Sequence, residues 1–264
     1  MAERQQMSKK IVQEPENLEE KVRAMRAGGK ILGGILKDLK EYVKPGMTGK
    51  EVDAWVRSET ERRGAKVAYD YLEEDFPGAI CISINDEIVH GIPTDYAFEE
   101  GDKVSFDMDL LYQGYYTDAG FTMLVGGKGS PAVKQMIKTV EQALWAGIDK
   151  VEPGARIGDI GYAVEKVLRK GKLGVIENYV GHGIGREMHM KPEVPNYGIR
   201  GTGYKLKVGD AICIEPMACL GKPANYVDPE SSWSVKLKDG SIGCYCEHTI
   251  LVTEDGCEVL TLPE

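Results

Sequence analysis

Several features that mark other classes of protein are missing from this chain. No apolar stretch reaches the roughly 18 residues needed to span a membrane, and the N-terminus lacks the hydrophobic run of a secretory signal. The basic residues are scattered and the formal net charge is −9, so nothing indicates a nucleic-acid ligand. No GxSxG or other nucleophile motif occurs. We therefore expect a cytoplasmic protein with no membrane partner and no specific nucleic-acid partner.

The cysteines also lack the spacing of a metal-binding or redox motif. None of the six is in CxxC spacing, which argues against a structural zinc site or a redox motif. Buried free thiols are the expected state, and they indicate a reducing compartment. The six are Cys81, Cys213, Cys219, Cys244, Cys246 and Cys257.

What is present is a chain of 264 residues with 42% apolar content, which is enough for one large domain. Residues 1–16 are polar and charged, so we expect a flexible N-terminal tail. Residues 17–264 are expected to form a single domain.

The two halves of that domain resemble each other. Val43-Lys44-Pro45-Gly46 recurs as Val151-Glu152-Pro153-Gly154, and Gly101-Asp102 recurs at the same offset as Gly209-Asp210. This repeat predicts two α+β halves, about 17–127 and 128–264, packed around a pseudo-twofold axis. The same offset aligns Asp107 of the first half with Glu215 of the second half.

Helical spacing is clear in both halves. Asn17 is expected to cap a helix from Leu18, interrupted at Gly28-Gly29 and Gly33-Gly34. Thr48-Gly49-Lys50-Glu51 is a capping box that opens a second helix to about Arg63. In the second half, helices are expected over about 132–150 and 158–170.

A β-hairpin dominates the first half. Apolar and polar residues alternate over 104–110, Tyr112-Gln113-Gly114 supplies a turn, and 115–124 returns. Asp107 and Asp118 are symmetric about the turn, so we expect them to face each other across the strands. Two facing carboxylates repel each other unless a cation lies between them. A strand around 211–215 and a final hairpin over 233–253 are expected later in the chain.

The repeat brings a set of metal-binding side chains together. A pseudo-twofold axis should make Asp107 meet Glu215, with Asp118 following through the hairpin. Glu247 lies in the final hairpin, and His182 lies in a glycine-rich turn. Four carboxylates and one imidazole carry too much negative charge for one metal ion, and they suit two divalent ions.

These residues occur in motifs that resemble type I methionine aminopeptidase, in order and at family spacing, over roughly residues 18–262. The motifs are His90, the Asp107/Asp118 pair, Gly181-His182-Gly183-Ile184-Gly185 with His189, Ile214-Glu215-Pro216-Met217 and Glu247-His248-Thr249. The resemblance implies the pita-bread (creatinase/aminopeptidase) fold, an α+β arrangement of two pseudo-twofold-related halves with antiparallel sheet and outer helices.

The resemblance also implies a function and a set of site residues. The enzyme would remove the initiator methionine from nascent proteins and peptides when the second residue is small, using water activated by two divalent ions. Cobalt, manganese, iron and zinc all remain open as the metal. The metal ligands would be Asp107, Asp118, His182, Glu215 and Glu247; the catalytic residues would be His90, His189 and Glu215; the substrate would contact His90, His189, Phe76, Cys81 and Trp233. A monomer is expected, and transient ribosome contact is left open.

Some positions depart from the family pattern. Asp109 shares a strand face with Asp107, where a neutral residue such as threonine is expected, and the 69–75 loop is longer. Two alternative interpretations of the function remain. One is a proline-specific peptidase of the same fold, which would usually carry an additional N-terminal domain. The other is a non-catalytic scaffold, which would usually have lost ligands.

Overall fold

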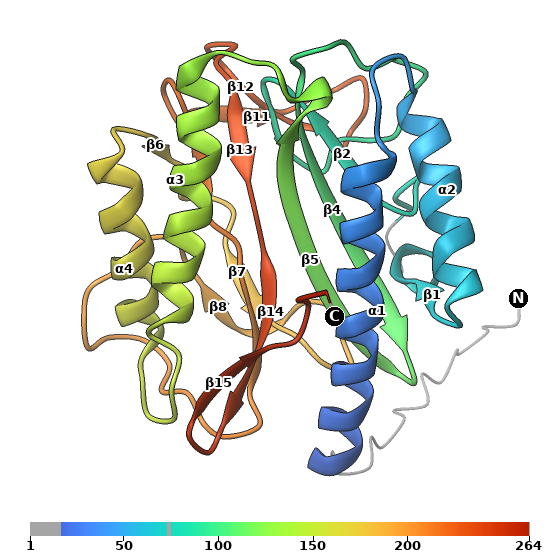
Figure 1. Ribbon diagram of the computed structural model, residues 1–264. Helices are drawn as coiled ribbons and strands as arrows, with labels where there is room; N and C mark the ends of the chain where they lie inside the picture. The colour runs from blue at the N-terminus through green and yellow to red at the C-terminus, as the bar shows by residue number, and fades with distance from the viewer. Residues whose placement is uncertain (1–16, 73–74, 264) are drawn as a thin grey trace, which may run out of the picture.

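The computed structural model describes residues 17–72 and 75–263. The expected N-terminal tail, residues 1–16, lies outside the described residues, as do two residues of the 69–75 loop. Figure 1 shows two helix pairs on the outside with strands between them. The helices are α1 (Leu18–Tyr42), α2 (Gly49–Arg62), α3 (Pro131–Ile148) and α4 (Ile157–Lys170), with short 3-10 helices at Ala68–Tyr71 and Val125–Gly127.

Most of the strands are short, and the strands that pair with each other run antiparallel. They are β1 (Lys66–Val67), β2 (Cys81–Ile84), β3 (Glu87–Val89), β4 (Lys103–Tyr112), β5 (Tyr115–Leu124), β6 (Gly174–Val175), β7 (Gly181–Gly183), β8 (Met190–Val194), β9 (Ala211–Ile214), β10 (Met217–Cys219), β11 (Asn225–Val227), β12 (Val235–Leu237), β13 (Gly243–Tyr245), β14 (His248–Thr253) and β15 (Gly256–Val259).

The helix starts follow the capping residues in the sequence. The Asn17 side chain accepts hydrogen bonds from the first-turn backbone of α1, at 3.1 and 3.3 Å. Thr48 and Glu51 form the predicted capping box of α2. Both caps satisfy backbone N–H groups that lack a partner within the helix. These two helix starts are confirmed.

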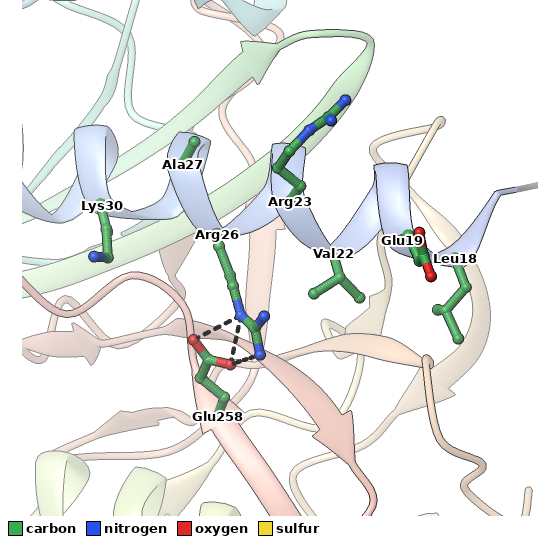
Figure 2. Close-up of a pocket in the computed structure, with 8 residues that line it drawn as sticks. All are labelled: Leu18, Glu19, Val22, Arg23, Arg26, Ala27, Lys30 and Glu258. Atoms are coloured by element: carbon green, nitrogen blue, oxygen red, sulfur yellow. Dashed lines mark hydrogen bonds and ion pairs between the residues drawn. The ribbon is translucent and has the colours of Figure 1, made fainter.

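The predicted interruptions in α1 are wrong, because the helix runs through its glycines without a break. A Cβ on Gly29 would lie 2.4 Å from the carbonyl oxygen of Leu260, and one on Gly33 would lie 2.5 Å from that of Thr261. The glycines therefore allow the C-terminal segment to pack directly on the helix. Figure 2 shows a second connection nearby, where the Arg26 Nη2 atom lies 2.7 Å from Glu258 Oε2. This pair is half-exposed and contributes little stability.

The β4–β5 hairpin differs by two residues from the predicted register. Tyr112 pairs with Tyr115, and the turn consists of Gln113 and Gly114, both with positive φ. A two-residue turn of this kind matches the twist of the strands. Asp118 therefore faces Asp109, and Asp107 faces Gly120. The expectation that Asp107 and Asp118 face each other directly is wrong.

The last part of the chain is also more divided than predicted. The strands β13 and β14 do not form a hairpin with each other, because β13 pairs with β10 whereas β14 pairs with β9 and β15. β12 lies in a separate sheet, where it pairs with β3 on one side and β11 on the other. A single hairpin over 233–253 is therefore wrong, and the chain changes sheets between 245 and 248.

The apolar side chains form one core under each helix pair and a smaller one among β3, β10, β12 and β13. The first lies between α1, α2 and the β4–β5 hairpin, and the second lies under α3 and α4. The third includes Ile88, Met217, Val235 and Tyr245. All six cysteines are free, and all but Cys257 are buried, as predicted. No helix in the described residues is long and apolar enough to cross a membrane.

Candidate active site

A cavity of about 450 Å³ lies where strands of the two halves meet. It gathers almost all of the residues that the sequence singled out. Its lining includes His90, Asp107, Asp118, His182, His189, Glu215 and Glu247, together with Phe76 and Trp233. The structure also adds Tyr69, Asp109, Met188 and Tyr245 to this lining.

Backbone pairing between the halves brings the carboxylates together. Gly120 on β5 forms an isolated bridge with Glu247, whose backbone N donates to the Gly120 carbonyl at 2.9 Å. The Thr249 hydroxyl donates to the Asp118 carbonyl at 2.7 Å and accepts from the Asp118 backbone N at 2.9 Å. These contacts hold Asp118 and Glu247 close together, although the two residues are 129 positions apart in the sequence.

Glu215 directly follows β9, and a hydrogen bond to its main chain holds it there. The buried side-chain amide of Asn196 donates to the Glu215 carbonyl oxygen at 3.0 Å. This bond fixes the strand end and leaves the Glu215 carboxylate directed to the cavity that Asp107 also lines. The expected meeting of Asp107 and Glu215 in one site therefore occurs.

His182 offers one ring nitrogen to this cluster. Its Nδ1–H donates to the Gly183 carbonyl at 3.0 Å, which leaves Nε2 as the acceptor. Nε2 lies 3.6 Å from Asp118 Oδ2 and 3.7 Å from Glu215 Oε1. These separations are too long for hydrogen bonds. They suit ligands of one ion at about 2.0–2.2 Å from each atom.

The buried carboxylates repel one another strongly without a cation. Burial, followed by the charge of Asp109, raises the pKa of Asp107 to about 7. The pKa values of Asp118, Glu215 and Glu247 are all raised well above the ordinary range, first by burial and then by neighbouring carboxylates. Burial lowers the pKa of His182 to about 4, so its imidazole is neutral at pH 7, the form that binds metals.

The donor set fits divalent metal ions. Asp107 Oδ1, Asp118 Oδ1 and Glu247 Oε1 are buried and have no hydrogen-bond partner within the described residues. Such atoms are costly unless something satisfies them. Among the described residues that line the cavity, none is a lysine or an arginine. Oxygen ligands with one neutral imidazole are suited to hard or borderline divalent ions.

The two other predicted histidines stand at the edge of the cluster. The His189 ring lies 4.6 Å from the His182 ring, nearly edge-on, and His189 is exposed. His90 has a φ of +58°, a strained conformation for a residue other than glycine. Burial, followed by the charge of His189, lowers the pKa of His90 to about 4. Both histidines can therefore reach a molecule that enters the cavity.

An aromatic wall closes one side of the cavity. Phe76 packs edge-on against Trp233, with ring centroids 5.4 Å apart, and lies 4.5 Å from the Tyr69 ring. Cys81, predicted for this wall, is fully buried and is not among the described lining residues. Its Sγ instead contacts the Tyr69 hydroxyl at 3.2 Å, so Tyr69 takes the place expected for Cys81.

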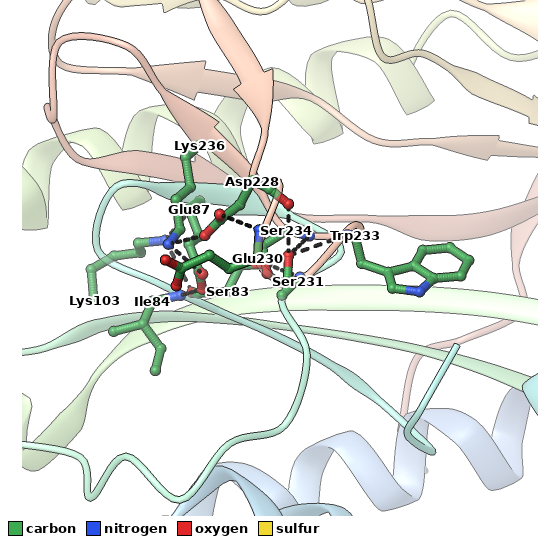
Figure 3. Close-up of polar contacts among 11 residues, drawn as sticks. Ser83, Ile84, Glu87, Lys103, Asp228, Glu230, Ser231, Trp233, Ser234 and Lys236 are labelled. Atoms are coloured by element: carbon green, nitrogen blue, oxygen red, sulfur yellow. Dashed lines mark hydrogen bonds and ion pairs between the residues drawn. The ribbon is translucent and has the colours of Figure 1, made fainter. Parts of the chain in front are cut away.

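A polar network supports the loop that carries Trp233. Figure 3 shows this network, with the Trp233 side chain extending away from it. Lys236 Nζ lies 2.6 Å from Asp228 Oδ2 and 3.7 Å from Glu87 Oε1. The Ser231 hydroxyl accepts from the backbone N atoms of Trp233 and Ser234, at 3.2 and 2.9 Å. The loop is thus tied to β3, which leads to His90.

Sequence reasoning missed several residues of the site. Tyr245 shares strand parity with Glu247, which is a signal that could have placed it in the cavity. Cys213 was expected only as a buried thiol. Its Sγ belongs to a group of potential ligand atoms that all lie within 4.8 Å of one another, with Asp118, His182 and Glu247.

Comparisons with known proteins agree with this geometry. The model of metallopeptidase family M24 matches residues 23–254. The methionine aminopeptidase of Mycoplasma capricolum is 37% identical over 246 residues, covering 93% of this chain and 97% of the relative. That of Aquifex aeolicus is 38% identical over 249 residues, covering 91% and 95%. The crystal structure of methionine aminopeptidase from Rickettsia prowazekii superposes with a TM-score of 0.89 at 35% identity, covering 94% of this chain and 99% of that one.

A metallopeptidase fold and a carboxylate-rich site are therefore both present. The chain belongs to metallopeptidase family M24, and within it to the methionine aminopeptidases. The predicted family and the predicted α+β pita-bread fold are confirmed. The protein is a metal-dependent hydrolase. The roles of the individual residues and the internal repeat remain predictions.

Proposed function

We propose that this enzyme removes the N-terminal methionine from peptides and nascent proteins whose second residue is small, using two divalent metal ions. Asp107, Asp118, His182, Glu215 and Glu247 would hold the ions. The observation that carries this proposal is the group of buried carboxylate oxygens that have no hydrogen-bond partner in the described part of the chain, gathered with a neutral imidazole in one cavity. Two ions would lower the pKa of a shared water toward neutrality and thereby supply a nucleophile.

Glu215 is the residue best suited to move protons. Its carboxylate lines the cavity beside the other proposed ligands. From there it can accept a proton from water and later pass it to the leaving amine. Its backbone is fixed by Asn196, so this oxygen donor is held in place at the end of β9.

The two histidines at the cavity edge would bind the reacting amide. His189 would donate a hydrogen bond to the carbonyl oxygen as negative charge develops on it. His90 is neutral at pH 7 because its pKa is about 4, so it would hydrogen-bond the scissile amide nitrogen or the following backbone without adding charge. Both histidines line the cavity, which supports these roles.

Selectivity for an N-terminal methionine would come from charge and shape together. The acidic floor attracts a free α-amino group, because unlike charges attract strongly at low dielectric. The aromatic wall of Tyr69, Phe76 and Trp233, with Met188, suits an unbranched thioether side chain, since sulfur packs well against aromatic rings.

Cobalt, manganese, iron and zinc would all fit the donors. We also propose a monomer in the cytoplasm, with nascent chains as substrates.

The decisive experiment measures metal binding and cleavage together. Chelator-treated protein is titrated with Mn²⁺ by calorimetry, and the loaded protein is then offered Met-Ala-Ser and Ala-Pro-Ala. We expect two ions per chain, release of methionine only from Met-Ala-Ser, and loss of this activity on chelation. Asp107→Ala and Glu247→Ala should abolish metal loading, whereas Asp255→Ala, a change at an exposed turn, should leave it intact.

Other results would contradict the proposal. Cleavage of Ala-Pro-Ala would favour a proline-specific peptidase of the same fold. No turnover with any of the four metals would favour a non-catalytic binding protein. Full activity in Asp107→Ala or Glu247→Ala would overturn the assignment of the metal ligands.

A further inference from the structure

The Tyr245 side chain lies in the floor of the cavity, between two of the proposed metal ligands. It is 1% exposed, and its hydroxyl donates a hydrogen bond to Glu247 Oε2. A phenol carries one proton, and Glu247 accepts it here. Asp107 lines the same cavity as Tyr245 and Glu247. Asp107 comes from β4 and Glu247 from the segment before β14, so Tyr245 lies where proposed ligands of the two halves meet.

The carboxylate oxygens that have no hydrogen-bond partner among the described residues show which atoms remain available for a metal ion. Glu247 Oε2 is bonded by Tyr245, and Glu247 Oε1 has no hydrogen-bond partner within the described residues. Asp107 Oδ1 likewise has none there. The Glu247 carboxylate is therefore oriented through Oε2 while Oε1 remains available. This is the arrangement expected of a group that orients metal ligands without ligating the metal itself.

The position of the phenol is fixed from both sides. A Cβ at Gly120 would lie only 2.2 Å from Tyr245 Cε1, so the aromatic ring occupies the space that any other residue at 120 would need. The Thr122 hydroxyl donates to the Tyr245 carbonyl at 2.5 Å and accepts from the Tyr245 backbone N at 3.3 Å. Ring and backbone are thus both held, so the hydroxyl cannot move far from the Glu247 carboxylate.

We propose that Tyr245 is a positioning residue of the metal centre, whose hydroxyl orients Glu247, beside Asp107, for metal binding. This proposal rests on the proposed function, because it takes those two residues as ligands. Residues that orient metal ligands typically cost 10–100-fold in metal affinity when they are replaced. The sequence reading assigned Tyr245 no role.

The test removes the hydroxyl alone. Tyr245→Phe and wild type are stripped with chelator and titrated with Mn²⁺ by calorimetry, and we expect at least one Kd to rise by 10–100-fold. The visible absorption of the Co²⁺ form should also change, because the geometry of the ligands changes. Tyr42→Phe is the matched control: Tyr42 stacks on Trp55 with centroids 4.6 Å apart, away from the cavity, and both readouts should stay as in wild type.

The outcomes separate this proposal from the proposed function. If wild type binds no metal, the proposed function fails. If wild type binds two ions and Tyr245→Phe binds them with equal affinity and an unchanged Co²⁺ spectrum, Tyr245 only fills space and the positioning role is wrong. Should Tyr245→Phe not fold, 3-fluorotyrosine at position 245 reports the same contact. Its ¹⁹F resonance should shift on titration with Zn²⁺, and an unchanged resonance overturns the proposal.

Discussion

Asp109 and Asp118 lie directly opposite each other across the β4–β5 hairpin, and their exposed fractions are 2% and 5%. Like charges in this arrangement destabilise a sheet. Asp109 is also a cause of the raised pKa values of Asp107 and Asp118. The hairpin therefore places negative charge beside the proposed metal ions, and this charge lowers the stability of the metal-free protein.

Replacing Asp109 by asparagine should separate these two effects. Asp109→Asn keeps the shape and removes one charge, so the free energy of unfolding of the metal-free protein should rise by about 1 kcal/mol. Mn²⁺ should bind about tenfold more weakly, because a nearby negative charge is lost. Urea denaturation in chelator and calorimetric titration measure the two quantities. Asp255→Asn at an exposed turn should change neither, and tighter Mn²⁺ binding by Asp109→Asn would contradict this account.

The pH dependence of stability should reveal the raised pKa of Asp107. Its pKa is 3.8 ordinarily and about 7 in the folded protein, so between these values the folded state binds more protons than the unfolded state. Stability from this group is therefore full below about pH 4 and is lost as pH rises through about 7. At 1.36 kcal/mol per pKa unit, the loss is up to about 4 kcal/mol.

The histidines oppose this trend at lower pH. His90 and His182 have folded pKa values of about 4, so they make stability rise with pH until their unfolded value of 6.5 is passed. The contribution of Asp107 is therefore isolated by comparison with Asp107→Asn, both in chelator. The difference in free energy of unfolding, wild type minus variant, should fall steadily from pH 4 to 7. A constant or rising difference would show that Asp107 ionises normally.

Much of the site could be predicted because its residues sit in short local motifs. The capping residues, the free thiols, and the carboxylates and histidines that meet at the cavity follow from such motifs, whereas Tyr69, Met188 and Tyr245 do not. The register of the β4–β5 hairpin was not, because it depends on whether the turn takes two or three residues, and Gln113 at positive φ is not signalled by its side chain. The continuity of α1 was missed because it depends on Leu260 and Thr261, which are distant in sequence.

His189→Ala should lower kcat about 10²–10³-fold on a Met-Ala-Ser substrate, the typical cost of losing one donor to a developing oxyanion. Metal content should stay unchanged, since His189 is not one of the proposed ligands. Steady-state kinetics and metal analysis check both points. His248→Gln is the matched control, because His248 Nδ1 contacts the Thr261 hydroxyl at 2.8 Å and does not line the cavity among the described residues. Loss of metal from His189→Ala would instead place His189 among the ligands.

Lys236→Met should loosen the loop that carries Trp233 without altering the metal centre. The change removes the contacts of Lys236 with Asp228 and Glu87 while keeping a long apolar side chain. Because partly exposed ion pairs contribute about 0–1 kcal/mol, the fold should persist. The KM for Met-Ala-Ser should rise about three- to tenfold, kcat should stay within about twofold, and selectivity for methionine over leucine should fall. Lys238→Met, an exposed change nearby, should leave all three values unaltered. If both variants keep the wild-type KM and selectivity, the network supports the fold of this loop but not the position of Trp233 over the substrate.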